Sequence, residues 1–286
     1  MITRLSLYIL CAVLALLLSS RVVYAEQDTH EKYAVYYADK IPVERFKPYH
    51  FLVLDGQHHP SLQPLKEDGK LVIAYISLGE VDMTSPSYAT LQSHGLILKE
   101  NKNWKGSFFV DIRNPLWPKI VIEDLIPQLL RQGFDGVFLD TLDNPSELEE
   151  ENPKLYHGMT DAAAHLVEAI RLNYPQIKIM MNRGYALLPK VAASTDMVLA
   201  ESLYYDYNFD TKTYGKVSAQ DYAEQLKALK DAQRINPQLK IYSLDYAQPT
   251  DTKTIADIYK TERANGFTPY VATVGLDLLV DEPKGN

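Results

Sequence analysis

The sequence predicts an α/β fold, a single (β/α)8 TIM barrel, and three observations support this. Short apolar runs rich in β-branched and aromatic residues recur along the chain, as is typical of parallel strands buried on both faces. Amphipathic stretches lie between these runs, which indicates helices that cover the strands. The runs also number eight, the strand count of this barrel. They span 34–37, 51–54, 71–77, 136–139, 177–181, 197–200, 241–244 and 270–274.

The helical stretches carry recognisable start and stop residues. A capping serine, Ser218, opens one of them, and Gly133 and Gly266 follow the ends of two others. The predicted helices span 118–131, 160–173, 218–235 and 251–264. A ninth apolar run, 108–110, is interpreted as a short strand in an enlarged loop between the third and fourth barrel strands. A doubly wound open sheet is the alternative, but no Gly-x-Gly-x-x-Gly turn follows the first strand.

Composition and charge exclude several classes of protein. The 286 residues are 46% apolar and 23% charged, which argues against a disordered chain or a fibrous repeat. Lys and Arg number 29 against 37 Asp and Glu, so the net charge is −8. An acidic chain lacks the basic surface that neutralises phosphates, and we therefore expect no nucleic-acid partner.

Residues 1–25 are predicted to be a signal peptide. Arg4 gives the positive start, 5–18 is apolar, and 23–25 fits a cleavage site. We therefore expect a secreted or periplasmic protein whose single domain covers 26–286, without a stable membrane anchor after cleavage. An uncleaved N-terminal anchor is the alternative, although the apolar stretch is short for a span. Cys11 is the only cysteine, so the mature chain would have no disulfide, thiol nucleophile or thiolate metal site.

Carboxylates fall at the ends of the predicted strands, where a barrel of this type carries its active site. The polar residues that follow the runs are Asp39, Asp55, Glu80, Asp140, Asn182, Glu201 and Asp245, with Asp111 after the extra run. Polar loops alone would explain Asp39 or Asp55. Asp140 and Glu201 follow strongly apolar runs directly, and a carboxylate there is costly unless it is paired, hydrogen-bonded or used in chemistry.

Paired carboxylates at a barrel mouth favour glycoside hydrolysis, in which one protonates the leaving oxygen and the other attacks the sugar or activates water. No Gly-x-Ser-x-Gly segment supports acyl transfer, and the histidines show no metal-binding spacing, so we expect neither a metal nor a cofactor. Tyrosine contributes 20 residues, and amphipathic rings suit sugars. We expect Tyr75 and Tyr204 to contact substrate, whereas Tyr205, Tyr207, Tyr242 and Tyr246 fit the core or the rim equally well.

Six segments resemble glycoside hydrolase family 114, which contains endo-α-1,4-polygalactosaminidases and is similar to the hydrolase domain of Pel exopolysaccharide proteins. They are 74–80, 110–115, 133–143, 182–184, 200–202 and 244–246, and GFDGVFLD within the third is the most specific. The resemblance covers essentially the whole chain after residue 25. It implies a TIM barrel, endo-acting cleavage of an α-1,4-linked galactosamine-rich polymer, and Asp140 and Glu201 as the catalytic pair. A departure at 81–85 leaves subsite preference open.

By analogy with α-galactosidase-type barrels, Asp140 is assigned as nucleophile and Glu201 as general acid/base. Retention would then require carboxyl groups about 5–5.5 Å apart, and inversion roughly 6.5–9.5 Å. The residues expected to bind substrate or tune the pair are Tyr75, Glu80, Asp111, Asn182, Tyr204 and Asp245. Glu80 and Asp245 are alternatively buried hydrogen-bonding partners. We expect a cationic amino-sugar polysaccharide as partner, with a non-catalytic polysaccharide-binding barrel and a hydrolase of a neutral α-glycan as alternatives.

Overall fold

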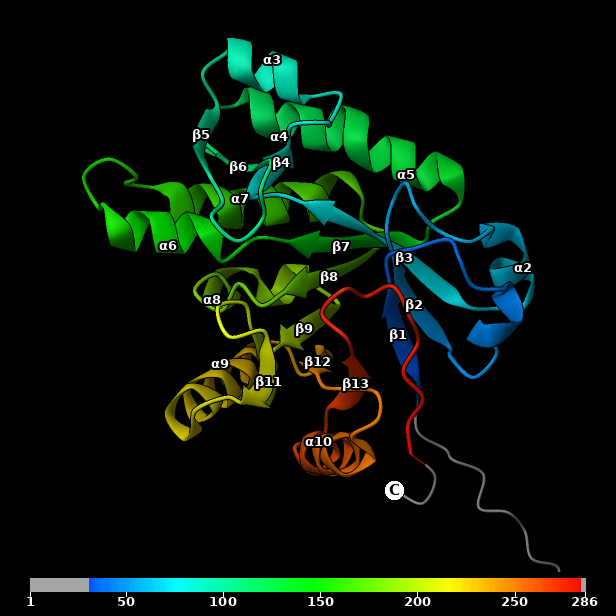
Figure 1. The fold of residues 1–286 in the computed structure, drawn as a ribbon. Helices are drawn as coiled ribbons and strands as arrows, with labels where there is room; N and C mark the ends of the chain where they lie inside the picture. The colour runs from blue at the N-terminus through cyan, green and yellow to red at the C-terminus, as the bar shows by residue number, and fades with distance from the viewer. Residues whose placement is uncertain (1–30, 284–286) are drawn as a thin grey trace, which may run out of the picture. The chain divides into compact units, whose positions relative to one another are not determined.

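Eight parallel strands form a nearly closed barrel in the computed structural model, which describes residues 31–283 (Figure 1). Their order in the sheet follows their order in the sequence, as the TIM barrel requires, so the predicted fold class is confirmed. The strands are β1 (Tyr33–Tyr36), β2 (Phe51–Leu54), β3 (Leu71–Ser77), β7 (Gly136–Asp140), β8 (Lys178–Asn182), β9 (Met197–Glu201), β12 (Lys240–Tyr246) and β13 (Thr268–Ala272).

The predicted strand boundaries agree with the structure for β2 and β3, and elsewhere the strand ends differ by at most two residues. The most informative difference is at the carboxyl ends. Asp140, Asn182 and Glu201 are the last residues of their strands, not the first residues after them. Ladder pairing reaches these positions, with Ser77 opposite Asp140, Asn182 opposite Leu199, and Leu244 opposite Glu201. Their side chains are therefore fixed by sheet geometry.

Aromatic side chains fill the barrel interior at the end away from the candidate site. The Tyr33 ring packs against Tyr242 at 4.8 Å and against Tyr270 at 5.6 Å, and Phe51 lies 5.2 Å from Tyr242. All four side chains are buried. Tyr242 therefore belongs to the core. At the other end, the backbone N–H of Tyr37 donates to the Leu276 carbonyl at 2.7 Å and joins the chain after β1 to the chain after β13.

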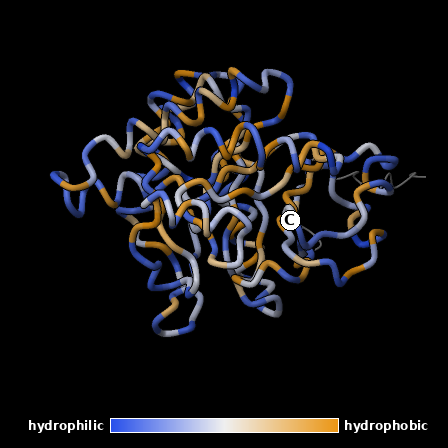
Figure 2. Tube along the Cα trace, turned by 90° about the horizontal axis from the view of Figure 1, so that it is seen from above, coloured by the Kyte–Doolittle hydropathy of each residue, from blue (hydrophilic) through white to orange (hydrophobic). Residues whose placement is uncertain are grey.

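Helices surround the strands, and the outer loops are largely hydrophilic (Figure 2). The side chains of Ser218 and Asp251 accept hydrogen bonds from the N–H groups of Asp221 and Thr254, which is the predicted N-terminal capping. Gly133, whose φ is 109°, ends the helical segment that starts at Leu116.

The longer helices are α5 (Ile126–Gln132), α6 (Asn144–Glu151), α7 (Met159–Asn173), α9 (Ala219–Ile235) and α10 (Thr252–Ala264). The shorter ones are α2 (Leu62–Glu67), α3 (Tyr88–Ser93), α4 (Leu116–Ile120) and α8 (Leu188–Val191), and single turns form η1 (Val43–Phe46), η2 (Val121–Leu125) and η3 (Ala192–Ser194).

Two small antiparallel sheets interrupt the alternation of strands and helices. The first lies between β3 and β7 and has the order β4 (Glu80–Asp82), β6 (Ser107–Val110), β5 (Ile97–Glu100). The apolar run at 108–110 belongs to β6. The second is a hairpin of β10 (Tyr205–Asn208) and β11 (Thr213–Lys216), which the sequence did not predict because its residues alternate without a buried face. Both sheets follow strands at their carboxyl ends.

The predicted signal peptide at 1–25 lies outside the described residues. Within 31–283, a search of the helices finds none with the length and apolarity needed to traverse a bilayer.

The close approach of β7 to β8 gives a test of the barrel packing. A Cβ atom at Gly136 would lie 2.0 Å from the Lys178 carbonyl oxygen, so Gly136→Ala must displace backbone. We expect this change to lower the free energy of unfolding by about 2–3 kcal/mol in denaturant titrations. Gly215→Ala is the matched control, because a Cβ there meets nothing within 4 Å, and we expect a change within about 0.5 kcal/mol. Equal stabilities of the two variants would contradict the close spacing of β7 and β8.

Candidate active site

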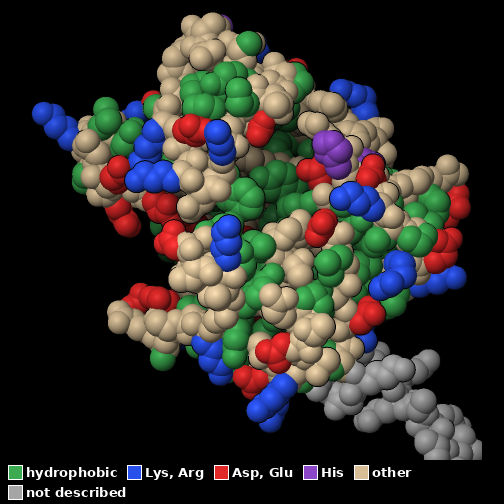
Figure 3. Space-filling view, in the orientation of Figure 1, with side chains coloured by type: hydrophobic (Ala, Val, Ile, Leu, Met, Phe, Trp, Pro, Cys, Tyr) green, Lys and Arg blue, Asp and Glu red, His purple; other side chains and the backbone are tan. Residues whose placement is uncertain are grey.

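A cavity of about 830 Å³ lies over the carboxyl ends of the barrel strands. The structure brings together Tyr75, Glu80, Asp140, Asn182 and Glu201 along its wall, and it does not place Asp111, Tyr204 or Asp245 there. In the space-filling view the molecule is hollowed between its upper and lower parts, with acidic and basic side chains around the hollow (Figure 3).

Asp140 and Glu201 are held together by one amide group. Asn182 Nδ2 donates to Asp140 Oδ1 at 2.7 Å and to Glu201 Oε2 at 2.5 Å. These two oxygens therefore lie no farther apart than the two bond lengths combined, about 5.2 Å. The three residues end the neighbouring strands β7, β8 and β9, so the barrel itself sets this spacing.

Tyrosine hydroxyls complete the contacts of the pair. Tyr246 Oη donates to Glu201 Oε1 at 2.5 Å, and Tyr75 forms a hydrogen bond with Asp140. Burial, and next the charge of Glu201, raise the pKa of Asp140 to about 6, while hydrogen bonds from Asn182, the Thr141 N–H and Tyr75 act in the opposite direction. Burial also raises the pKa values of Tyr75 and Tyr246 far above normal, so both hydroxyls stay protonated as donors.

The residues that follow the three strand ends adopt left-handed backbone. Thr141, Arg183 and Ser202 have φ angles of 62°, 47° and 52°, a conformation that costs non-glycine residues energy. Each is held by hydrogen bonds. The Arg183 N–H donates to the Leu199 carbonyl at 2.8 Å, the Ser202 N–H donates to the Leu244 carbonyl at 2.8 Å, and Thr141 Oγ1 accepts from the Gly79 N–H at 2.7 Å. The chain thus turns sharply directly after each residue of the triad Asp140, Asn182 and Glu201.

Glu80 lines the cavity, but its carboxylate is already satisfied by protein donors. Oε1 accepts from Asn101 Nδ2 at 2.7 Å and from Asn144 Nδ2 at 2.6 Å, and Oε2 accepts from Ser107 Oγ at 2.6 Å. Only 5% of the residue is exposed. The contacts match the alternative of a buried hydrogen-bonding partner: Glu80 fastens the first small sheet to α6.

Asp245 is fully buried behind the cavity, which also matches the alternative of a buried partner. Its Oδ1 accepts from the backbone N–H groups of Tyr204 at 2.7 Å and Tyr205 at 2.8 Å. It therefore anchors the chain that leaves Glu201. Burial, opposed by these backbone hydrogen bonds, raises the pKa of Asp245 to about 8.

The other predicted substrate residues are engaged elsewhere. Asp111 follows β6, not a barrel strand, and pairs with Arg113 at 2.7 Å, an interaction that lowers the pKa of Asp111. The Tyr204 hydroxyl donates to Asp257 at 3.1 Å on the outer side of the hairpin. Asp55 caps its own turn by accepting from the N–H groups of Gln57 and His58. Of the predicted acidic ring, Glu80, Asp140 and Glu201 line the cavity, whereas Asp55, Asp111 and Asp245 do not.

Several cavity residues were not assigned a role from the sequence. Tyr37 directly follows β1, and Tyr246 is the last residue of β12. Their neighbours in the sequence are partly apolar, so the sequence did not distinguish them from tyrosines of the core. Thr141, Asp143, Arg183, Asp206 and Phe209 come from loops whose paths the sequence did not reveal.

Among the described lining residues, seven carry carboxylates and two carry cations. The acids are Asp82, Asp140, Asp143, Glu147, Asp206, Glu80 and Glu201, and the cations are Lys105 and Arg183, the latter paired with Asp143 at 2.8 Å.

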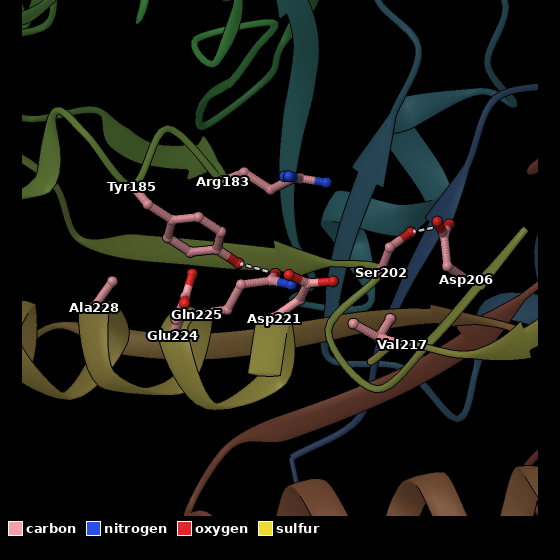
Figure 4. Close-up of a pocket in the computed structure, with 9 residues that line it drawn as sticks. All are labelled: Arg183, Tyr185, Ser202, Asp206, Val217, Asp221, Glu224, Gln225 and Ala228. Carbon is pink, nitrogen blue, oxygen red and sulfur yellow. Dashed lines mark hydrogen bonds between the residues drawn. The ribbon is translucent and has the colours of Figure 1, made fainter. Parts of the chain in front are cut away.

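A second cavity, of about 440 Å³, adjoins the first between the β9 loop and α9 (Figure 4). Arg183, Ser202 and Asp206 line both cavities. In the close-up, Ser202 Oγ donates to Asp206 at 2.6 Å, and the Tyr185 hydroxyl donates to Gln225 at 3.0 Å. Across 31–283, no three His, Cys, Asp or Glu side chains are arranged to hold a metal ion.

Comparison with known proteins identifies relatives of the whole described fold. The model of glycoside-hydrolase family GH114 matches residues 22–286. The glycoside hydrolase domain of PelA from Pseudomonas aeruginosa superposes with a TM-score of 0.77 and 26% identity, over 88% of this chain and 98% of that one. Ega3 of Aspergillus fumigatus, solved in complex with galactosamine, has the same fold at a TM-score of 0.64 and 16% identity, over 88% of this chain and 95% of that one. An uncharacterized protein of Deinococcus radiodurans is 27% identical over 223 residues, which are 74% of this chain and 67% of the relative.

The buried carboxyl of Asp245 predicts a pH-dependent stability. Its pKa is raised on folding, so the folded protein keeps a proton that the unfolded chain loses above about pH 4. This group therefore makes the protein less stable as the pH rises from about 4 towards 8. Asp245→Asn keeps an acceptor for Tyr204 and Tyr205 but cannot ionise. We expect the melting temperature of the variant, relative to wild type, to increase between pH 5 and pH 8.5.

Asp245→Ala is the control for this experiment, because it leaves two buried N–H groups without their acceptor. It should be less stable than wild type at every pH. A constant difference between Asp245→Asn and wild type across the pH range would mean that Asp245 does not titrate as described.

Proposed function

Because the chain belongs to glycoside hydrolase family GH114 and is a glycosidase, we propose that it cleaves a galactosamine-rich polysaccharide at internal α-1,4 linkages with retention of configuration. The observation that carries the proposal is the pair of carboxylates bridged by the Asn182 amide at the floor of the cavity.

We further propose that residues 1–25 direct export of the protein. Sequencing the N-terminus of the mature protein tests this, and we expect it to begin after residue 25.

The geometry of the pair supports a retaining mechanism with Asp140 as nucleophile and Glu201 as acid/base. An upper limit of about 5.2 Å between the bridged oxygens suits direct attack and leaves little room for the extra water of an inverting site. In the first step the Asp140 carboxylate bonds to the anomeric carbon while Glu201 gives its proton to the departing oxygen. In the second, Glu201 takes a proton from water, whose oxygen displaces Asp140 and restores the free carboxylate.

The surrounding donors have defined tasks in this scheme. Asn182 and Tyr75 orient Asp140 for attack, and Tyr246 and Asn182 orient Glu201 towards the leaving group. When Asp140 becomes an ester it loses its negative charge, so Asn182 retains Glu201 as its one anionic hydrogen-bond acceptor. These are positioning roles, because each residue acts through a carboxylate.

The charge of the cavity supports a cationic polymer as substrate. Seven carboxylates against two cations favour protonated amines, and one of the cations, Arg183, is neutralised by Asp143. The presence of galactosamine in the Ega3 structure is consistent with the same class of sugar. A cavity of about 830 Å³ that extends to both small sheets also suits several units of a chain better than a single terminal sugar.

The catalytic roles predict the effects of two conservative substitutions. Asp140→Asn and Glu201→Gln should each lower kcat on partly deacetylated poly-α-1,4-galactosamine by roughly 10³-fold or more, because either change removes one member of a cooperating pair. Product analysis by size should show a rapid early fall in mean chain length with wild type, and NMR should show the α-anomer released first. Glu224→Gln, outside the main cavity, is the matched control and should leave kcat unchanged.

Other outcomes of that experiment would redirect the proposal. Full activity in either variant would remove that residue from the catalytic pair. Initial release of the β-anomer would replace retention with inversion. Cleavage of fully acetylated or neutral α-glycans in preference to the deacetylated polymer would favour the neutral-glycan alternative, and so would a KM that does not rise with added salt.

The proximity of the two carboxylates predicts a pH profile and the direction in which it moves. The mechanism requires one proton on the pair, carried by Glu201 when Asp140 attacks. Because the charge of Glu201 helps raise the pKa of Asp140 to about 6, the pair loses this last proton near that pH, and kcat/KM should fall as the pH rises above about 6. Glu201→Gln removes a charge that raises this pKa and should therefore lower it. Carboxyl NMR of protein labelled at aspartate would measure the shift, and Asp143→Asn and Asp245→Asn would identify the signals of the two other aspartates whose pKa values burial raises. An unchanged or raised value would show that the two carboxylates are not coupled.

A further inference from the structure

Two exposed aromatic side chains from separate insertions meet at the wall of the main cavity. Trp104 lies in the loop between β5 and β6, and Phe209 lies in the turn between β10 and β11. Their ring centroids are 5.6 Å apart with an interplanar angle of 74°, and both residues line the cavity that contains Asp140 and Glu201. Trp104 is 55% exposed and Phe209 is 43% exposed. The small sheets that carry them lie on the same side of the barrel as its carboxyl mouth (Figure 1).

The contact continues into the hairpin as a row of rings. Phe209 packs against Tyr207 at 5.2 Å, and Tyr207 packs against its cross-strand partner Tyr214 at 5.0 Å. Neither Trp104 nor Phe209 is covered by other parts of the described chain to the extent that a core ring would be. Large apolar side chains left open in a polar cavity indicate a binding surface.

Both loops that present these rings are fastened in place. Glu80 accepts hydrogen bonds from Asn101 and Ser107, which stand at the two ends of the loop that carries Trp104. The turn that carries Phe209 is closed by Asn208 Oδ1, which accepts from the N–H groups of Asp210 at 3.0 Å and Thr211 at 2.9 Å. The aromatic pair is therefore held in position before a ligand arrives, which lowers the entropy cost of binding.

We propose that Trp104 and Phe209 form a sugar-binding subsite for a pyranose unit away from the bond that is cut. This inference rests on the proposed function and extends it. The apolar C–H face of a pyranose packs on an aromatic ring, and a protonated amino group adds attraction to the electron-rich face of an indole. Because the two rings are in contact, they form one binding surface within the cavity that also contains Asp140 and Glu201.

The chain offers a direct reporter of this subsite. It contains two tryptophans, and Trp117 is 2% exposed, with its Nε1 donating to the Leu78 carbonyl at 2.8 Å. Quenching of tryptophan fluorescence by acrylamide therefore reports mainly on Trp104. In the uncut complex of the Asp140→Asn variant, we expect long oligogalactosamine to protect the fluorescence from quenching and galactosamine monomer not to protect it.

Substitutions separate a subsite from a structural role. Trp104→Ala should raise KM for long chains by about 10-fold and change kcat little, and Trp104→Phe should restore most of the affinity. Phe209→Ala should act in the same direction. Activity on the shortest cleavable oligomer should be unaffected in all three. Leu172→Ala is the matched control, since Leu172 is 82% exposed and does not line the cavity.

The outcomes distinguish this inference from the function on which it rests. If wild type cuts the polymer but Trp104→Ala keeps its KM and long chains give no protection from quenching, the subsite is wrong and the proposed function stands. An equal loss on long and short oligomers would assign Trp104 to the fold and overturn the subsite. If wild type neither cuts nor binds the polymer, the proposed function fails and the subsite for that polymer fails with it.

Discussion

The arrangement of the whole site depends on placing two acidic groups close together in a partly buried cavity, which their mutual repulsion opposes. A single amide, that of Asn182, donates to both and makes the arrangement stable. It can do so because Asp140, Asn182 and Glu201 end three consecutive parallel strands. In such a sheet neighbouring strands lie roughly 4.8 Å apart, so Asp140 and Glu201 start from strands about twice that distance apart, and their side chains converge on the Asn182 amide between them. The tyrosine hydroxyls then refine the orientation of each group.

Carboxylates serve two different purposes around this barrel mouth. Glu80 and Asp245 accept hydrogen bonds from protein donors and fix, respectively, the first small sheet and the start of the hairpin. Asp140 and Glu201 stay accessible from the cavity. The same residue type thus has a structural role and a chemical role, and burial distinguishes the two: Glu80 and Asp245 are buried, whereas Asp140 and Glu201 are only partly buried.

Much of the fold was predictable, because eight apolar runs and intervening amphipathic stretches carry the periodicity of a barrel in the sequence itself. Asp140, Asn182 and Glu201 were predictable for the same reason, since each follows an apolar run whose end fixes its place at the mouth. Asp111 and Tyr204 follow apolar residues too, yet Asp111 directly follows β6 and Tyr204 directly precedes β10. Both flank inserted sheets and not barrel strands, and the sequence gave no sign of this. The contact between Trp104 and Phe209 joins residues about a hundred positions apart, so only the folded chain reveals it.

The left-handed residues Thr141, Arg183 and Ser202 have a consequence for any attempt to improve this protein as a catalyst for use at high temperature. Glycine relieves strain of this kind, but it also removes the side-chain contacts of Thr141 with Gly79, of Arg183 with Asp143 and of Ser202 with Asp206. Selection for heat resistance alone would favour glycine wherever the relieved strain outweighs the lost contact. Each directly follows a member of the triad. A glycine there would give the backbone more conformational freedom, and the neighbouring side chain of the triad would be held less firmly in its orientation. Screening of variants for heat resistance would therefore select proteins that remain folded on heating but have a lower kcat, unless kcat is measured in the same screen.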